Sequence, residues 1–381
     1  MGSKLKDLYG QQGQSPWLDF IRRNMLNDGG LRRYVDSGIR GVTANPTIFA
    51  QAIGAADDYD EQIGELARQG VPPREMFEQI ALQDIKQACD ILRPVFDASG
   101  GSDGFVSIEV SPEKAFQTQA TIDEAKKWWS LIGRPNLLVK IPGTTEGLPA
   151  IEECLASGVN INITLLFAVS YYEQVMEAYL RALERRLAGG EDVRSVNSVA
   201  SFFVSRVDTA GDKLIEAKIA DAKSDAERSK LQALLGQVAN ANAKVAYQRF
   251  LAVFGSDRFA KLKAAGAKVQ RPLWASTGTK NKAYSDVLYV DNLIGPDTVN
   301  TMPPSTIEAF VDHGVMRRTL DKGVGDADRV LAGLAEAGIS IDAITDQLQK
   351  DGVEAFAKSF NEIAEITAKK ADEIRARATA A

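Results

Sequence analysis

The sequence predicts an α/β protein that folds as a single (β/α)8 barrel of the TIM type. Strand-like apolar runs alternate with helical patterns along almost the whole chain, which indicates repeated βα units and a parallel sheet. Eight such runs are present, and eight parallel strands close this kind of barrel. No glycine-serine linker, proline-rich linker or internal repeat interrupts the chain. One domain covering residues 1–381 is therefore favoured over two.

The clearest strands are two apolar runs near the middle of the chain. The first, Asn136–Ile141, is apolar from Leu137 onward except for Lys140, as expected of a parallel strand buried on both faces. Helix-like sequence over residues 145–156, closed by Gly158, separates it from the second, Asn160–Phe167. The other expected strands are Trp17–Ile21, Gly41–Ala44, Gly104–Val110, Val199–Val204, Val269–Ser276 and Asp286–Leu293.

Additional helices are expected between the strands and after them. Two helical patterns, Asp57–Gln69 and Pro73–Phe96, lie between the second and third runs. An alanine-rich, charged region predicts a helical insertion at residues 209–265. A proline pair starts a helix after the eighth run, and residues 326–381 predict a C-terminal helical segment. These additions explain a chain longer than the about 250 residues typical of the fold.

The composition excludes several classes of protein. Hydrophobic residues make up 45% of the chain and charged residues 25%, as in ordinary globular domains. The net charge of −6, with no lysine or arginine cluster, argues against a nucleic-acid partner. No apolar run is long enough to span a membrane, and the polar N-terminus is not a secretory signal. We therefore expect a cytoplasmic protein, and the sequence leaves monomer and homodimer open.

The cysteines and the histidine limit the chemistry. Cys89 and Cys154 lie far apart in helical patterns, so we expect two buried free thiols in a reducing compartment. His313 is the only histidine, which excludes a serine-histidine mechanism elsewhere and any multi-histidine metal site. Carboxylates and lysines must then carry acid-base work, and we expect neither a metal nor another cofactor.

Polar residues stand at or near the ends of most of the expected strands. One such residue has an ordinary explanation, because Asp and Asn often cap helices and Ser and Thr often bond the local backbone. Seven of them at converging strand ends instead predict a polar pocket with one amine and two carboxylates. These residues are Asp19, Asn45, Glu109, Lys140, Thr164, Ser201 and Ser276.

Lys140 allows two interpretations. A lysine in a buried strand is often ion-paired or extends its ammonium to water. Alternatively it is a Schiff-base lysine, because burial disfavours the charged ammonium form and a neutral amine attacks a carbonyl. The iminium that forms is an electron sink, and two carboxylates can move the protons of an aldol cleavage. The presence of Glu109 and Asp19 at the ends of other expected strands favours this metal-free chemistry.

The chain contains six motifs at or near these strand ends: VTANPTIF (42–49), VSIEVSP (106–112), LVKIPGTTEG (138–147), NINITLLF (160–167), SFFVSRVD (201–208) and WASTGTKN (274–281). Together they resemble the motifs of transaldolase in its longer bacterial form. The resemblance runs from Trp17 to Leu293 and implies a (β/α)8 barrel that transfers a dihydroxyacetone unit from a ketose phosphate to an aldose phosphate in the pentose phosphate pathway. The donors are sedoheptulose 7-phosphate or fructose 6-phosphate, and the acceptors glyceraldehyde 3-phosphate or erythrose 4-phosphate.

The resemblance also implies a role for each site residue. Lys140 matches the Schiff-base lysine, Glu109 the glutamate that acts through a water, and Asp19 the acid and base at the cleaved bond. The residues that match the water and hydroxyl ligands are Asn45, Asn162, Thr164 and Ser201, and those assigned to the phosphate are Arg206, Ser276 and Lys280. Phe203 is also expected to contact the substrate. Two positions depart from shorter members of the family, which have an arginine in the loop of Lys280 and a different sequence around Asp19.

Two alternatives remain. A related lyase releases free dihydroxyacetone, and lyases that resemble this family tend to carry glutamine and tyrosine at the positions of Glu109 and Phe203. A non-catalytic phosphosugar-binding barrel requires the loss of a catalytic group, and Lys140, Glu109 and Asp19 are all present. The sequence thus favours transfer.

Overall fold

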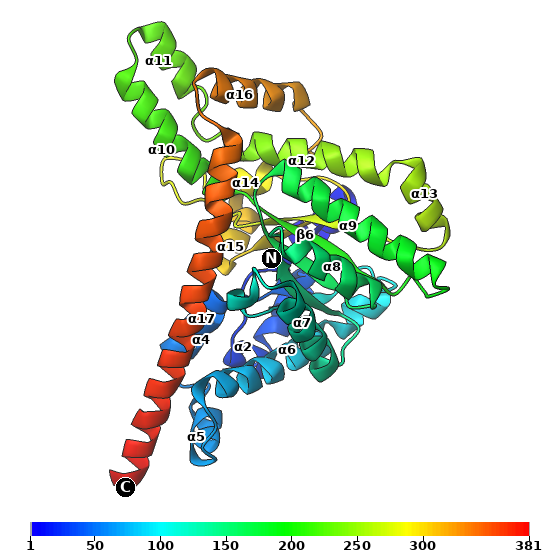
Figure 1. The fold of residues 1–381 in the computed structure, drawn as a ribbon. Helices are drawn as coiled ribbons and strands as arrows, with labels where there is room; N and C mark the ends of the chain where they lie inside the picture. Colours follow the sequence, from blue (N-terminus) through cyan, green and yellow to red (C-terminus); the bar gives the residue numbers. More distant parts are fainter. Residues whose placement is uncertain (1, 381) are drawn as a thin grey trace.

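A closed barrel of eight parallel strands forms the centre of the molecule, and helices surround it (Figure 1). The computed structural model describes residues 2–380, so the two ends of the predicted 1–381 range lie outside the described residues. Each strand pairs with the next one along the chain, and the last pairs with the first. The strands are β1 (Gln14–Leu18), β2 (Gly41–Thr43), β3 (Phe105–Glu109), β4 (Leu137–Pro142), β5 (Ile161–Leu166), β6 (Ser198–Phe203), β7 (Arg271–Ala275) and β8 (Thr298–Met302). The predicted (β/α)8 barrel is confirmed.

The predicted position of the eighth strand is wrong. Residues 286–293 contain the short helix α14 (Leu288–Asp291), and the strand follows at Thr298–Met302. That strand has only two apolar residues, because Thr298, Asn300 and Thr301 are all buried and polar. Its polar side chains bond residues of neighbouring segments, and Thr277 Oγ1, for example, donates to Asn300 Oδ1 at 2.8 Å. A strand of this kind gives no apolar signal in the sequence.

The first strand is displaced for the same reason. It begins at Gln14 and ends at Leu18, three residues before the predicted Trp17–Ile21. Gln14 and Ser15 are fully buried, and Gln14 Nε2 donates to the carbonyl oxygen of Leu293 at 2.6 Å. The other six strands agree with the predicted ranges to within two residues.

The helices follow the predicted plan. The insertion predicted at 209–265 contains four helices, of which the first starts earlier, directly after β6. Gly158 closes α8 in the left-handed conformation, with a φ of 84°. Cys89 and Cys154 are buried free thiols, as predicted. The remaining helices are α1 (Gly2–Gln12), α2 (Arg23–Asn27), α3 (Gly30–Ser37), α4 (Pro46–Ala55), α5 (Asp60–Arg68), α6 (Pro73–Ala98), the 3-10 helix η1 (Pro112–Lys114), α7 (Thr118–Ile132), α8 (Gly147–Ala156), α9 (Val169–Ala188), α10 (Ser205–Asp221), α11 (Asp225–Gln232), α12 (Val238–Phe254), α13 (Asp257–Ala264), α15 (Pro304–His313), α16 (Val324–Glu336) and α17 (Ile341–Ala380).

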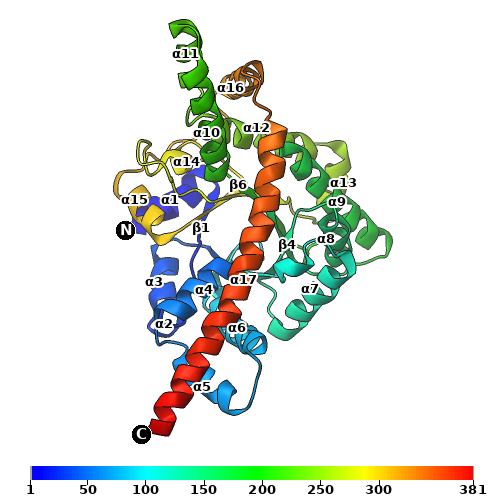
Figure 2. The ribbon, with the colours of Figure 1, turned by 60° about the vertical axis from the view of Figure 1, so that its left-hand side comes forward.

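The last helix, α17, crosses the molecule from α10 at one end to α5 at the other (Figures 1 and 2). On its way it packs on α4 and α6 and contacts β5. Gln349 Nε2 donates to the carbonyl oxygens of Gly143, just after β4, and of Leu165 in β5, at 3.0 and 3.3 Å. The helix therefore lies over the carboxyl ends of the strands, where active sites of this fold are built.

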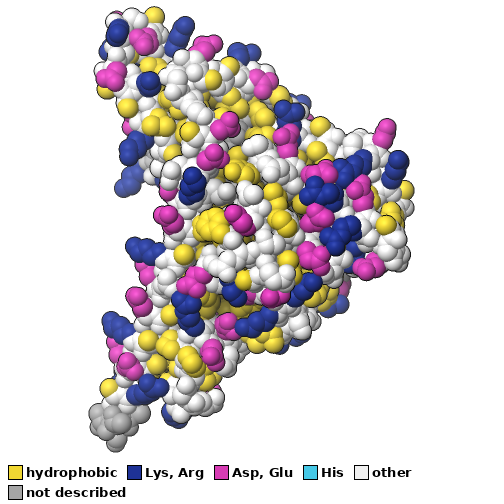
Figure 3. All heavy atoms as spheres, in the orientation of Figure 1, with side chains coloured by type: hydrophobic (Ala, Val, Ile, Leu, Met, Phe, Trp, Pro, Cys, Tyr) yellow, Lys and Arg dark blue, Asp and Glu magenta, His cyan; other side chains and the backbone are white. Residues whose placement is uncertain are grey.

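The surface carries charges of both signs. On the face shown in Figure 3, lysine and arginine side chains alternate with aspartate and glutamate. Among the described residues, no helix combines the length and the apolar character that crossing a lipid bilayer requires.

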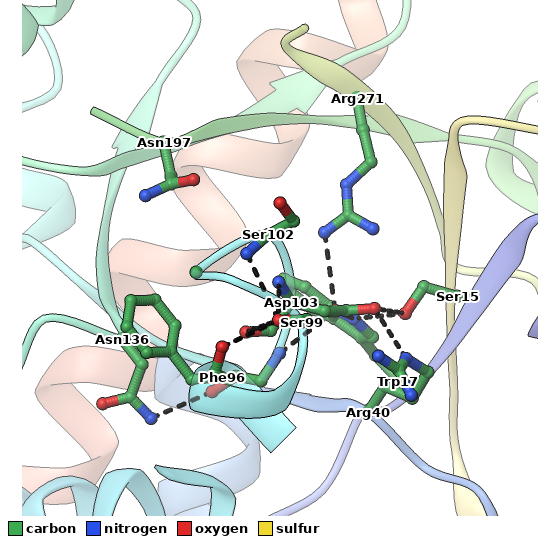
Figure 4. Close-up of polar contacts among 12 residues, drawn as sticks. Ser15, Trp17, Arg40, Phe96, Ser99, Ser102, Asp103, Asn136, Asn197 and Arg271 are labelled. Atoms are coloured by element: carbon green, nitrogen blue, oxygen red, sulfur yellow. Dashed lines mark hydrogen bonds and ion pairs between the residues drawn. The ribbon is translucent and has the colours of Figure 1, made fainter. Parts of the chain in front are cut away.

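Asp103 closes the other end of the barrel, at the start of β3 (Figure 4). Its carboxylate accepts hydrogen bonds from Ser15 Oγ at 2.6 Å, Arg40 Nε at 2.8 Å and Trp17 Nε1 at 3.0 Å, and Arg271 Nη2 lies 3.5 Å away. Burial raises the pKa of Asp103, but Arg271, Arg40 and Ser15 together outweigh burial and hold that pKa below its usual range. Asp103 is thus a buried anion that joins β1 and β7 and binds two cations, Arg40 and Arg271.

We expect Asp103→Asn to lower the free energy of unfolding by about 3 kcal/mol, because it leaves two largely buried guanidinium groups without their shared counter-charge. Thermal unfolding monitored by circular dichroism measures this loss. Activity at 25 °C should be retained, since Asp103 lies at the opposite end of β3 from Glu109. Asp192→Asn is the control, because Asp192 pairs with Arg194 on the open surface. Equal midpoints for Asp103→Asn and the parent chain would contradict this account.

Candidate active site

Lys140 lies on β4 beside Glu109 on β3, because the register of the two strands pairs these residues directly. The Nζ atom of Lys140 is 3.2 Å from Glu109 Oε2 and 3.3 Å from the carbonyl oxygen of Ala44. Only 4% of Lys140 is exposed. The barrel therefore holds an amine and a carboxylate in contact, largely shielded from water.

Glu109 is a buried carboxyl group with spare acceptor capacity. Burial raises its pKa, although the charge and hydrogen bond of Lys140 act in the opposite direction. No hydrogen-bond partner reaches its Oε1 atom from the described residues. A carboxyl group with a raised pKa and a free oxygen is suited to exchange protons near neutral pH.

Asp19 follows β1 and faces the same cavity. Its Oδ1 atom accepts a 2.6 Å hydrogen bond from Thr43 Oγ1, which also lies 2.6 Å from Thr301 Oγ1. Burial deep in the barrel mouth raises the pKa of Asp19. The Thr43 hydrogen bond and the charges of Lys140, Lys280 and Arg206 counter that effect only in part. The second carboxylate is thus also poised to change its protonation state.

Four further predicted residues are polar groups around these three. Ser201 Oγ donates to Asn162 Oδ1 at 2.7 Å, and Asn162 Nδ2 donates to Ser107 Oγ at 3.0 Å. Thr164 is fully buried, and its Oγ1 has no partner among the described residues. Asn45 caps α4, because its Oδ1 accepts from the backbone N–H of Ile48 at 3.0 Å. The capping explanation for Asn45 is therefore correct, and the residue also faces the cavity.

A cavity of about 530 Å³ joins these groups. Glu109 and Asn162 do not line it, but they contact Lys140 and Ser201, which do. His313 lies elsewhere, exposed at the end of α15, and pairs with Asp286 and Asp312. The predicted residues that line the cavity are Asp19, Asn45, Lys140, Thr164, Ser201, Phe203, Arg206, Ser276 and Lys280.

Two cationic side chains besides Lys140, those of Arg206 and Lys280, also line the cavity. Arg206 lies in the first turn of α10, with its guanidinium 5.5 Å from the centre of the Phe203 ring. Burial lowers its pKa from a high ordinary value. Ser276 adopts the left-handed conformation, with a φ of 55°, and its carbonyl oxygen accepts from the N–H of Ser205 at 3.1 Å. Lys280 is exposed on the loop that follows.

Several lining residues were not predicted from the sequence. Thr43 stands two residues before Asn45, and alternate residues of an extended chain face the same side. This spacing could have predicted that Thr43 faces the cavity. Thr301 was missed because the eighth strand was misplaced. Gln51 extends from α4, and Phe356 reaches the cavity from α17 with its ring centre 5.9 Å from Lys140 Nζ.

Comparison with known proteins gives a consistent result. A sequence model of the family described as Transaldolase/Fructose-6-phosphate aldolase matches residues 16–366. The chain is 47% identical over 357 residues to "Transaldolase 2" of Nostoc sp. (strain PCC 7120), covering 93% of this chain and 94% of that protein. It is 47% identical over 365 residues to "Transaldolase" of Parafrankia sp. (strain EAN1pec), covering 95% and 96%, and 45% identical over 354 residues to "Transaldolase" of Trichodesmium erythraeum, covering 92% and 93%. The chain therefore belongs to the transaldolase/fructose-6-phosphate aldolase family.

Proposed function

We propose that this protein is a transaldolase that works through a Schiff base on Lys140. The observation that carries the proposal is the buried contact between Lys140 and Glu109, with a second, half-buried carboxylate, Asp19, facing the same cavity. An amine nucleophile and two proton-transfer groups are the set that an aldol cleavage through an iminium requires. The substrates are sugar phosphates, and the chain works as a single domain in the cytoplasm.

The first half of the reaction builds the electron sink. The neutral amine of Lys140 adds to the C2 carbonyl of the ketose phosphate and forms a carbinolamine. Loss of one water from C2 gives the iminium, and Glu109 supplies and recovers the protons through a water. The free Oε1 of Glu109 and the unpartnered Oγ1 of Thr164 support this role, because both are buried and able to hold that water.

The second half breaks and remakes a carbon-carbon bond. Asp19 takes the proton of the C4 hydroxyl, the C3–C4 bond breaks, and its electron pair moves into the iminium to give an enamine. An aldose phosphate leaves, and another enters. The enamine carbon then attacks the new aldehyde, Asp19 returns the proton, and hydrolysis of the new iminium frees Lys140. The polar side chains of Asn45, Asn162 and Ser201 orient the hydroxyls of the retained three-carbon unit.

Transfer rather than release of dihydroxyacetone is the preferred function for two reasons. Glu109 and Phe203 stand where lyases of this family tend to carry glutamine and tyrosine. In addition, α17 covers the strand ends and Phe356 lies over Lys140, which limits access of water to the bound unit.

Product analysis from fructose 6-phosphate, with and without erythrose 4-phosphate, tests this function. We expect sedoheptulose 7-phosphate and glyceraldehyde 3-phosphate only when the acceptor is present. Accumulation of free dihydroxyacetone without the acceptor would instead identify a lyase.

Arg206 is proposed to bind the phosphate group of the donor, with Ser276 and Lys280 beside it. We expect Arg206→Ala to raise the KM for fructose 6-phosphate about 10-fold to 100-fold, because a charge-assisted hydrogen-bond pair is lost. Conversion of unphosphorylated fructose should not change. Arg249→Ala is the control, since Arg249 forms an exposed pair with Glu173. Equal losses with both donors would remove Arg206 from phosphate recognition.

A further inference from the structure

Two buried carboxylates follow Arg206 along α10. Asp208 and Asp212 lie one helical turn apart, and both are almost fully buried. Asp208 Oδ2 accepts a 2.9 Å hydrogen bond from the hydroxyl of Tyr289, and Asp212 Oδ2 accepts a 2.7 Å hydrogen bond from that of Tyr284. The proton-transfer steps above use neither carboxylate. Their tyrosine partners both belong to the connection between β7 and β8, which also carries Lys280.

The remaining carboxylate oxygens hold the segment before and at the start of α12. Asp212 Oδ1 accepts from the N–H of Gly236 at 3.0 Å, and Asp208 Oδ1 accepts from that of Ala239 at 2.7 Å. Burial raises the pKa of Asp208 to about 6, so this group is mainly ionised at pH 7.5 and accepts the bonds from Tyr289 and Ala239. α10 therefore fixes two other segments through the side chains of Asp208 and Asp212.

The loop of Lys280 is closed at its base and open at its tip. Thr279 Oγ1 donates to the carbonyl oxygen of Ser285 at 2.8 Å, and a turn follows in which the N–H of Tyr284 donates to the carbonyl of Asn281 at 3.1 Å. Residues 280–283 are exposed. Tyr284 is the residue after this tip, and its side chain returns to α10 and bonds Asp212.

Gly236 makes room for the ring of Tyr284. It adopts a φ of 68°, and a Cβ atom added there would lie 2.9 Å from Cζ of Tyr284. The ring thus occupies a fitted position against the segment that Asp212 also holds. A hydrogen bond and a close packing contact both fix where the loop tip stands relative to α10.

We propose that Tyr284 and Asp212 are positioning residues for phosphate recognition, which hold the 279–285 loop so that Lys280 and Arg206 face the same phosphate group. The inference rests on the proposed function, because that function supplies the phosphate. It assigns the pair to the phosphate end of the cavity and gives it no part in the chemistry at Lys140. The Asp208–Tyr289 bond secures the following segment of the same connection.

The test compares a phosphorylated donor with an unphosphorylated one. Tyr284→Phe should raise the KM for fructose 6-phosphate about threefold to tenfold, the effect of losing one hydrogen bond to a charged group. The kcat for fructose 6-phosphate and all values for unphosphorylated fructose should stay at the parent level. Tyr179→Phe is the matched control, because it also removes a hydroxyl, one that donates to the carbonyl of Lys268 at 2.8 Å. Equal losses with both donors, or no loss, would overturn the proposal.

A double-mutant cycle tests whether Tyr284 acts through Lys280. In a Lys280→Ala background, Tyr284→Phe should add no further increase in KM, whereas additive effects would overturn the proposal. Asp212→Asn provides a second, independent variant with the same expected pattern. Calorimetric titration with inorganic phosphate separates this proposal from the proposed function. Weaker phosphate binding by Tyr284→Phe than by the parent chain supports the positioning role, even if the parent chain transfers no dihydroxyacetone unit. Equal phosphate binding by the two proteins contradicts the positioning role.

Discussion

Lys140→Ala is expected to abolish the covalent labelling of the protein by fructose 6-phosphate and borohydride, and to reduce transfer by at least about 10³-fold. Borohydride reduces an iminium to a stable amine, so mass spectrometry of the intact protein detects the adduct. Lys140 is the buried lysine of the cavity, whereas Lys280 is exposed on a loop. The loss should therefore be complete in this single variant.

Two comparisons make the result specific. Lys280→Ala should still be labelled, because the proposal assigns Lys280 to the phosphate. Lys140→Met keeps most of the side-chain volume next to Phe356, which guards against a packing defect in the alanine variant. In both Lys140 variants Glu109 loses the neighbour that lowers its pKa, so it becomes protonated more readily. The protonated carboxyl group is neutral, so neither variant leaves an unpaired charge buried beside position 140. Labelling of Lys140→Ala at full stoichiometry would end the Schiff-base assignment.

Much of the barrel was predictable from the sequence because most of its strands are buried on both faces. Such strands are continuous apolar runs, and β3 to β7 fall close to the predicted ranges. The prediction failed at β1 and β8, which pair with each other. There buried polar groups such as Gln14 and Asn300 replace apolar ones, and their partners Thr298 and Thr277 lie 284 and 23 residues away in the chain. Local periodicity contains no information about partners at that distance.

The candidate site was predictable to the extent that it follows from topology. The carboxyl ends of parallel strands meet at one end of a barrel, so Asp19, Glu109 and Lys140 were expected to converge. Phe356 was not predictable, because nothing local in a long amphipathic helix says that it crosses the mouth of the barrel. Its position depends on contacts such as those of Gln349 with the ends of two strands. The cover of the pocket is thus a property of tertiary packing.

Asp19→Asn is expected to separate imine formation from bond cleavage. The amide cannot take the proton of the C4 hydroxyl, so transfer should fall by about 10²-fold to 10⁴-fold. Borohydride labelling should persist, because Lys140 and Glu109 are unchanged. The substitution preserves shape, and the amide oxygen still accepts the hydrogen bond from Thr43. Normal turnover by this variant would move the proton-transfer role to another group.

The same substitution is expected to stabilise the protein at neutral pH. Burial raises the pKa of Asp19 in the folded chain, so folding favours its protonated form over the carboxylate. The stability linked to that proton is complete below the pKa of the unfolded chain and is lost as the pH rises through the folded pKa. Folding therefore opposes the ionisation of Asp19 at neutral pH, and the neutral amide avoids that cost. Thermal midpoints should be higher for Asp19→Asn at pH 7.5, and the difference should shrink as the pH falls towards 4. A lower midpoint at pH 7.5 would contradict this account. It would show that the attraction of the Asp19 carboxylate to Lys140 and Arg206 exceeds the cost of its desolvation.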